Sequence, residues 1–110
     1  MRILVSLEDD YRAYRDVIAT GIRILRPRAE VETADPVALE EETRRFEPEV
    51  VICGRPTAAD SSDRRAWIEL SLDPLRPSKI RVGDRRWEST NLTLEELLGI
   101  IDDTLSNIRG

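Results

Sequence analysis

The chain has 110 residues, which is enough for one domain with a single hydrophobic core. Hydrophobic residues make up 40% of it and charged residues 35%, a balance typical of a folded globular domain and not of a disordered chain. The net charge of −5 argues against general affinity for nucleic acids or anionic membranes, and the absence of histidine excludes a Ser-His triad and removes the commonest metal ligand.

The N-terminal residues predict a buried strand followed by a helix. Residues 2–7 form an apolar run without alternation, which is typical of a central parallel strand covered on both faces. Asp9 or Asp10 can cap the helix that follows. In residues 11–25 apolar positions recur at helical spacing, and Pro27 ends the helix. The positions expected to face the core are Tyr14, Val17, Ile18, Gly21, Ile22 and Leu25.

Two further strands and a second helix complete the first half. Residues 29–33 alternate in polarity, as a half-exposed strand near a sheet edge does. Asp35 and Pro36 predict a helix start, and Pro48 bars its continuation. Residues 50–53 predict a second buried strand. Right-handed crossovers then place the first strand between the other two, in the order 2-1-3.

The second half predicts antiparallel strands and a last helix. Residues 67–72 are strand-like, and the Pro-rich turn after them is too short for a crossover helix, so the strand at 79–82 should run antiparallel. Gly83-Asp84 predicts a two-residue turn into a strand over 85–89. A capping box at residues 93–96 starts the C-terminal helix. Its expected buried stripe is Leu94, Leu97, Leu98, Ile101, Leu105 and Ile108.

The expected fold is therefore α/β: one domain over 1–110, a three-layer sandwich whose parallel βαβαβ half is extended by antiparallel strands and closed by a C-terminal helix. Cys53 is the only cysteine, so no intrachain disulfide exists. The start lacks a signal-peptide pattern, and no segment reaches the ~20 apolar residues of a membrane span. We expect a cytoplasmic protein that does not bind membranes.

One family resemblance spans the first half of the chain. The run from Met1 to Val5, the acids at 8–10 and the amphipathic helix after them resemble the start of a response-regulator receiver domain. The resemblance continues through residues 47–52, where a Pro-acid pair leads into a strand. It implies a flavodoxin-like scaffold and a role in bacterial signalling.

The resemblance also implies where a phosphorylation site would lie. In receivers an acidic pair after the first strand holds Mg²⁺, and here that pair is Glu8 and Asp9. The phosphoacceptor position after the third strand falls on Gly54, with Cys53 before it, and neither residue can form an acyl phosphate. The second half has neither the hydroxyl-bearing switch strand nor the Lys-Pro of receivers. We therefore expect a receiver-like domain that is not phosphorylated at the usual site.

Four residues are candidates for a binding site at the carboxyl ends of the first and third strands: Glu8, Asp9, Cys53 and Arg55. Open α/β sheets bind ligands at this edge. Helix capping is an alternative role for the two acids, and a buried inert thiol is the alternative for Cys53. We expect no metal site and no cofactor.

Three residues are candidates for an interface in the second half: Trp67, Arg81 and Trp87. Exposed edge strands need covering, and tryptophan is enriched in interface hot spots, although both tryptophans could equally fill the core. The leading hypothesis is a non-catalytic domain that contacts a protein partner or a second copy as a homodimer. A small-ligand binder or enzyme using the crevice is the alternative. Nucleic-acid binding by the Arg-rich segment 55–90 is disfavoured by the acidic total.

Overall fold

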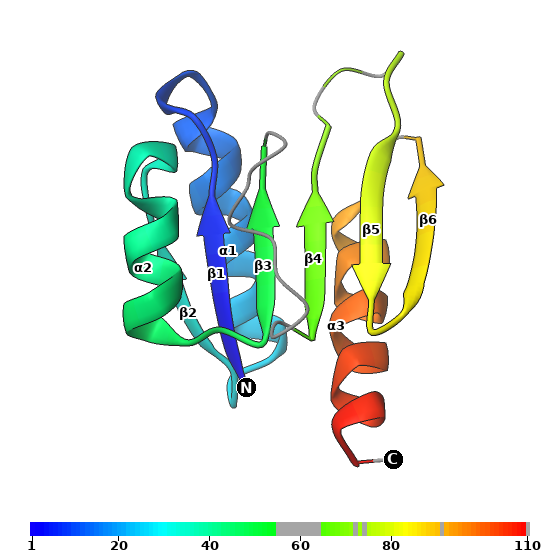
Figure 1. The fold of residues 1–110 in the computed structure, drawn as a ribbon. Helices are drawn as coiled ribbons and strands as arrows, with labels where there is room; N and C mark the ends of the chain where they lie inside the picture. Colours follow the sequence, from blue (N-terminus) through cyan, green and yellow to red (C-terminus); the bar gives the residue numbers. More distant parts are fainter. Residues whose placement is uncertain (55–64, 72, 74, 91, 110) are drawn as a thin grey trace.

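A computed structural model describes residues 1–54, 65–71, 73, 75–90 and 92–109 (Figure 1). Within these residues six strands form one sheet, and three α-helices pack on it. In chain order the elements are β1 (Arg2–Ser6), a 3-10 turn (Asp9–Tyr11), α1 (Arg12–Leu25), β2 (Glu30–Thr33), a 3-10 turn (Pro36–Ala38), α2 (Leu39–Phe46), β3 (Val50–Cys53), β4 (Ala66–Glu69), β5 (Ser78–Val82), β6 (Arg85–Ser89) and α3 (Leu94–Arg109).

The strands lie in the order β2-β1-β3-β4-β5-β6 (Figure 1). β1 pairs in parallel with β2 and β3, which confirms the predicted 2-1-3 order. β4 also runs parallel to β3, so the parallel half has one strand more than the sequence indicates. β5 runs antiparallel to β4, with Ile80 beside Ile68, and this pairing is confirmed as predicted. Leu72, the predicted end of β4, lies outside the described residues.

The ends of the elements agree with the local sequence signals. The predicted start at Asp35 and Pro36 is a 3-10 turn that leads directly into α2. The capping box before α3 is present, because the Glu96 N–H donates to Thr93 Oγ1 at 3.2 Å. Gly83 has a φ of +59°, a backbone conformation that glycine adopts readily in the predicted two-residue turn.

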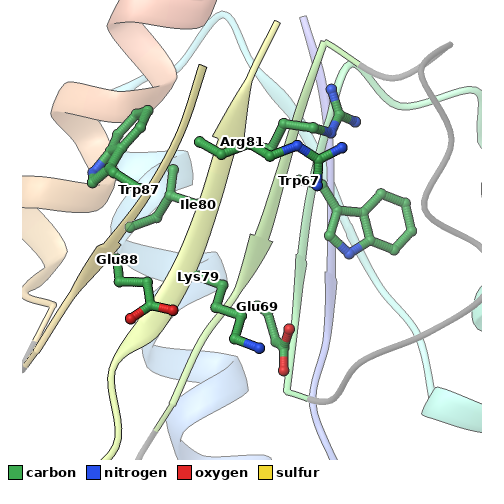
Figure 2. Close-up of a pocket in the computed structure, with 8 residues that line it drawn as sticks. Trp67, Glu69, Lys79, Ile80, Arg81, Trp87 and Glu88 are labelled. Carbon is green, nitrogen blue, oxygen red and sulfur yellow. The ribbon is translucent and has the colours of Figure 1, made fainter. Parts of the chain in front are cut away.

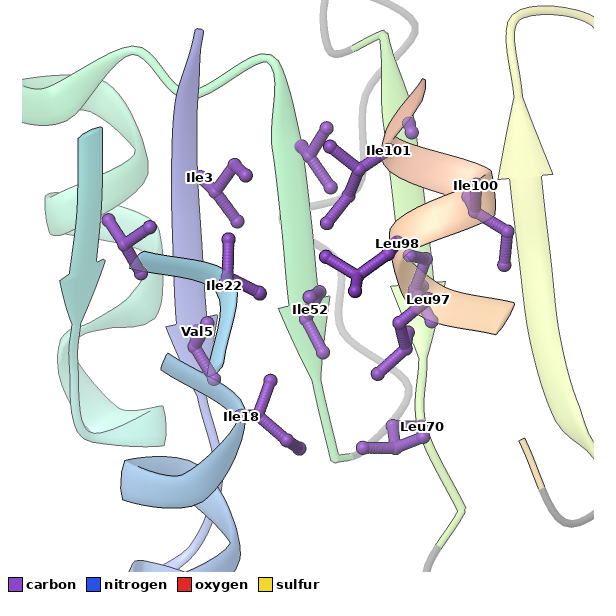
Figure 3. Packing of buried hydrophobic residues seen from close by; sticks show 14 of the residues in the cluster. Ile3, Val5, Ile18, Ile22, Ile52, Leu70, Leu97, Leu98, Ile100 and Ile101 are labelled. Atoms are coloured by element: carbon purple, nitrogen blue, oxygen red, sulfur yellow. The ribbon is translucent and has the colours of Figure 1, made fainter. Parts of the chain in front are cut away.

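The sheet divides the core into two clusters. α1 and α3 cover one face and α2 covers the other (Figure 1). Because successive strand residues point to opposite faces, Ile3 and Val5 point toward α1 and α3, whereas Leu4 points toward α2. Figure 3 shows Leu97 and Leu98 of α3 packed in the larger cluster. The smaller cluster contains Leu4, Ala34, Leu39, Phe46, Val51, Cys53 and Trp67.

α1 turns a different face to the core from the one predicted. The helix buries Ile18, Ala19 and Ile22. The prediction is confirmed for Ile18 and Ile22, but it is wrong for three other positions, which are exposed: Tyr14, Val17 and Leu25. The stripe of α3 is buried at Leu97, Leu98 and Ile101 and half-buried at Leu94, while the side chains of Leu105 and Ile108 lie outside the described part.

Two arginines lie beside the buried stripe of α1. Arg15 of α1 and Arg26 directly after the helix are both half-buried, and Arg15 Nε is buried 3.5 Å from Asp16 Oδ1. Gly21 allows α1 to approach α3 closely, since a Cβ at Gly21 would lie 2.8 Å from Leu94 Cδ2. The inner face of α1 is therefore made partly by charged residues, which a search for apolar spacing does not select.

A bidentate ion pair connects the end of α1 to α3. Arg26 Nε lies 2.8 Å from Asp102 Oδ1, and the Arg26 terminal nitrogen lies 2.6 Å from Asp102 Oδ2. These hydrogen bonds, aided by the positive charge, lower the pKa of Asp102 below its ordinary value of 3.8, against an opposing effect of burial. The carboxylate form of Asp102 therefore favours the folded state.

Replacing Asp102 with asparagine is expected to lower the thermal midpoint at neutral pH. Because the pKa is depressed in the folded state, the stabilisation is complete above 3.8 and is lost as the pH falls through the folded pKa. The midpoints of the wild type and the variant should therefore converge in acid, which calorimetry over a pH series measures. Asp103→Asn is the control, because Asp103 is exposed and has no ion pair within the described residues. A gap that persists unchanged in strong acid contradicts this account.

Candidate functional site

A buried leucine lies at the predicted crevice, at the carboxyl ends of β1 and β3. Ser6 pairs with Cys53 in register, so the two strand ends are adjacent, as predicted. Leu7 follows β1 and is fully buried in the larger cluster. A Cβ at Gly54 would lie 3.2 Å from Leu7 Cδ2, so Gly54 and Leu7 are already in close contact. Cys53 is 2% exposed and packs in the smaller cluster.

The acidic residues after β1 form a turn. The Tyr11 N–H donates to the Glu8 carbonyl at 2.8 Å, and Asp9 and Asp10 begin the 3-10 turn. The residue before α1 is Tyr11, which makes no side-chain capping hydrogen bond, so Asp10 is not the N-cap of α1. The predicted capping by Asp9 concerns a side chain outside the described part of the chain. Of the four candidate binding residues, Glu8 and Cys53 thus lie at the carboxyl ends of the neighbouring strands β1 and β3. The side chain of Asp9 and the whole of Arg55 lie outside the described part of the chain.

A serine at this edge carries an unsatisfied hydroxyl. Ser6 is 1% exposed, and its Oγ has no hydrogen-bond partner among the described residues. We expect Ser6→Ala to leave the free energy of unfolding unchanged or to raise it by up to about 1 kcal/mol, because no hydrogen bond is lost. Ser78→Ala is the matched control: Ser78 is equally buried, but its Oγ accepts from the Ser71 N–H at 2.9 Å, so its loss should cost about 1 kcal/mol. Urea unfolding of both variants measures the contrast, and a clear loss for Ser6→Ala contradicts it.

The other end of the sheet presents an open face, which we define by six residues on the side of β4, β5 and β6 opposite α3: Trp67, Glu69, Lys79, Arg81, Arg86 and Glu88. They line a shallow cavity of about 400 Å³ (Figure 2). No helix of the described part of the chain covers this open face, because α2 packs over β1 and its neighbours. Counting the described elements, the sheet has three layers around β1 and two around β6.

The strand register arranges the open face in two cross-strand rows. Lys79 lies between Glu69 and Glu88, so acid, base and acid alternate across one row. In the other row Arg81 lies beside Arg86, and like charges directly opposite each other are unfavourable. The face is thus charged and polar at its outer strands.

The three candidate interface residues differ in exposure. Trp67 is 5% exposed and belongs to the smaller core cluster. Arg81 is also buried, and its terminal nitrogen donates to the Gly83 carbonyl at 3.2 Å. Trp87 is 37% exposed on the outermost strand, with the Arg85 guanidinium 5.8 Å from the centre of its ring. Of the three, Trp87 offers the largest accessible surface.

The chain matches no protein-family model, no curated protein and no solved structure. Within the described residues no cluster of three acidic or cysteine side chains is placed to hold a metal ion. None of the helices in those residues is long and apolar enough to cross a membrane. The functional assignment therefore depends on the surfaces of the molecule itself.

Sequence reasoning missed a second group of exposed apolar residues. Four lie in α1 and one in the turn before it: Tyr14, Val17, Ile24 and Leu25, and Tyr11. The tyrosine rings contact each other edge to face, with centres 6.5 Å apart. Exposed apolar patches of this kind often mark contact surfaces. The number of apolar residues in 11–25 was the available signal, because it exceeds what one face of a helix can bury.

A groove between α1 and α2 is lined by four arginines and three acidic residues. It has a volume of about 880 Å³ and lies beside β2. Arg45 lies 2.6 Å from Glu32 and 2.5 Å from Glu42, and the hydrogen bond from Arg45 lowers the pKa of Glu42. Arg15 lies 3.7 Å from Asp35. Two of the four arginines, Arg15 and Arg45, thus lie beside acidic residues of the groove itself.

Proposed function

We propose that the chain is a non-catalytic, receiver-like domain of bacterial signalling that works in the cytoplasm by contact with a protein, through the β4–β6 end of its sheet. One observation carries the proposal: the open face and the outer strand β6 place charged and aromatic side chains at a sheet end that no described helix covers. Natural proteins usually protect such ends, and partners use them when they are left open.

The residues at the carboxyl ends of β1 and β3 support a role without catalysis. The position that accepts phosphate in receivers falls on Gly54, which has no side chain. Leu7 packs against Gly54, and the Cys53 thiol is buried, so the described residues at this position present no exposed nucleophile. These observations count against the alternative of an enzyme or small-ligand binder at this crevice.

The only lysine of the chain gives a direct test. Lys79 is exposed on the open face, so an amine-acetylating reagent reports on that face alone, apart from the Met1 amine. We expect acetylation of Lys79 to fall severalfold when the protein is placed in an extract of its own host cells, compared with the dilute purified protein. The measurement is peptide mass spectrometry after brief labelling.

The Met1 amine is the internal control, because it precedes β1, which β3 and β4 separate from β5. Its labelling should change little. Equal labelling of Lys79 in the extract and in the purified protein would count against the proposal.

A further inference from the structure

We propose that two copies of the chain pair edge to edge through β6, in an antiparallel register centred on Trp87. This inference rests on the proposed function and names the partner as a second copy. β6 is the last strand of the sheet, and no described strand pairs with its outer edge. Its first four residues are exposed. A free, exposed strand edge of this kind is a template for pairing with another chain.

The hydrogen-bond pattern identifies which residues of β6 face outward. The Gly83 N–H donates to the Arg65 carbonyl at 2.9 Å, toward β4. Because backbone groups alternate in direction along a strand, the even-numbered residues of β5 face β6. In register these pair with Arg85, Trp87 and Ser89. The N–H and C=O groups of Arg86 and Glu88 therefore point to the outer edge.

Charge then selects one register. Outward-facing residues must oppose outward-facing residues, so Arg86 can lie opposite the partner's Arg86 or the partner's Glu88, or Glu88 opposite the partner's Glu88. Two of these pairings oppose like charges, which is unfavourable. Placing Arg86 opposite the partner's Glu88 sets each charge against an opposite charge. Because the dimer has two-fold symmetry, this ion pair forms twice. Arg86 and Glu88 are exposed and have no ion pair within the described residues, so both are available.

The same register places Trp87 opposite the partner's Trp87. This is a pair without hydrogen bonds between its own backbone groups, where side chains approach most closely. Trp87 pairs with Ile80 across β5 and so lies on the α3 face, away from the charged row. Two aromatic rings would thus meet on one face and two ion pairs on the other. The strand is self-complementary in backbone, charge and apolar surface.

A disulfide test follows from the geometry. In this register the two Cα atoms at position 87 lie about 4.5 Å apart, within disulfide range, whereas those at position 85 are roughly 14 Å apart, which is beyond it. The native Cys53 is buried and does not interfere. We expect Trp87→Cys to form a covalent dimer under mild oxidation on non-reducing gels, and Arg85→Cys, an exposed position on the same strand and face, to remain monomeric.

A charge exchange tests the native interface by sedimentation velocity. Arg86→Glu or Glu88→Arg alone opposes like charges twice and should raise the dissociation constant by about tenfold or more. The double variant restores opposite charges and should restore pairing. A wild type that is monomeric at every concentration, equal cross-linking of both cysteine variants, or a double variant as weak as the singles overturns the proposed pairing. Protection of Lys79 in the extract alongside a monomeric wild type would leave the proposed function intact with a different partner.

Discussion

Replacing Trp67 with alanine is expected to lower the free energy of unfolding by about 3–5 kcal/mol. Trp67 is almost fully buried and packs in the smaller cluster with Leu4, Phe46 and Cys53. Its loss removes a large apolar surface and leaves a cavity that the β-strands around it cannot close. Urea unfolding followed by far-ultraviolet circular dichroism measures the change, because this signal does not depend on tryptophan fluorescence.

Trp87→Ala is the matched control for Trp67. Trp87 is on the outermost strand and over a third exposed, so its removal should cost less than about 1 kcal/mol in dilute solution, where copies do not pair. The two tryptophans thus separate stability from association: Trp67 should affect unfolding, and Trp87 should affect sedimentation. Equal destabilisation by both changes contradicts this division.

Replacing Ile22 with alanine is expected to destabilise the fold by about 2–5 kcal/mol. α1 buries only three residues, and Ile22 is the largest fully buried one, in contact with the larger cluster shown in Figure 3. Little neighbouring side-chain volume on α1 can relax into the space, since Ala19 is small. Chemical denaturation of the purified variant measures the loss through the shift of the midpoint.

Ile24→Ala tests the rotation of α1 with the same chemical change. Ile24 is two residues further along and 69% exposed, so its replacement should change the free energy of unfolding by about 0.5 kcal/mol or less. Comparable losses at Ile22 and Ile24 would mean that α1 buries both sides, and the outer surface of α1 would then not be an open apolar patch.

The parallel half of the fold could be predicted because β1 and β3 are unbroken apolar runs, and runs of this kind fit only a sheet covered on both faces. The face of α1 could not, because apolar residues occur on both sides of the helix and arginine stems fill part of the inner one. The direction of β4 relative to β3 cannot be read from residues 66–69. The alternation of side chains along β4 shows that Trp67 and Glu69 share a face of the sheet, but it does not show which face a helix covers.

The candidate site was predictable in position but not in character. The order of the strands brings the ends of β1 and β3 together, and the sequence placed Glu8 and Cys53 there. That Leu7 would fill the same space depends on the direction of its side chain after the last paired residue, Ser6. The residues that would pair two copies, Arg86, Trp87 and Glu88, can be read from the sequence. They predict edge-to-edge pairing only once β6 is known to be the outermost strand.

The unequal covering of the sheet has a consequence for how the domain opens. β1 and β3 are held between helices on both faces, whereas β6 has no fully buried side chain and, among the described strands, pairs only with β5. Local unfolding takes the path that exposes least apolar surface. Backbone amides of β6 should therefore exchange with solvent through fraying of the hairpin, while those of β1 exchange only when the whole domain unfolds.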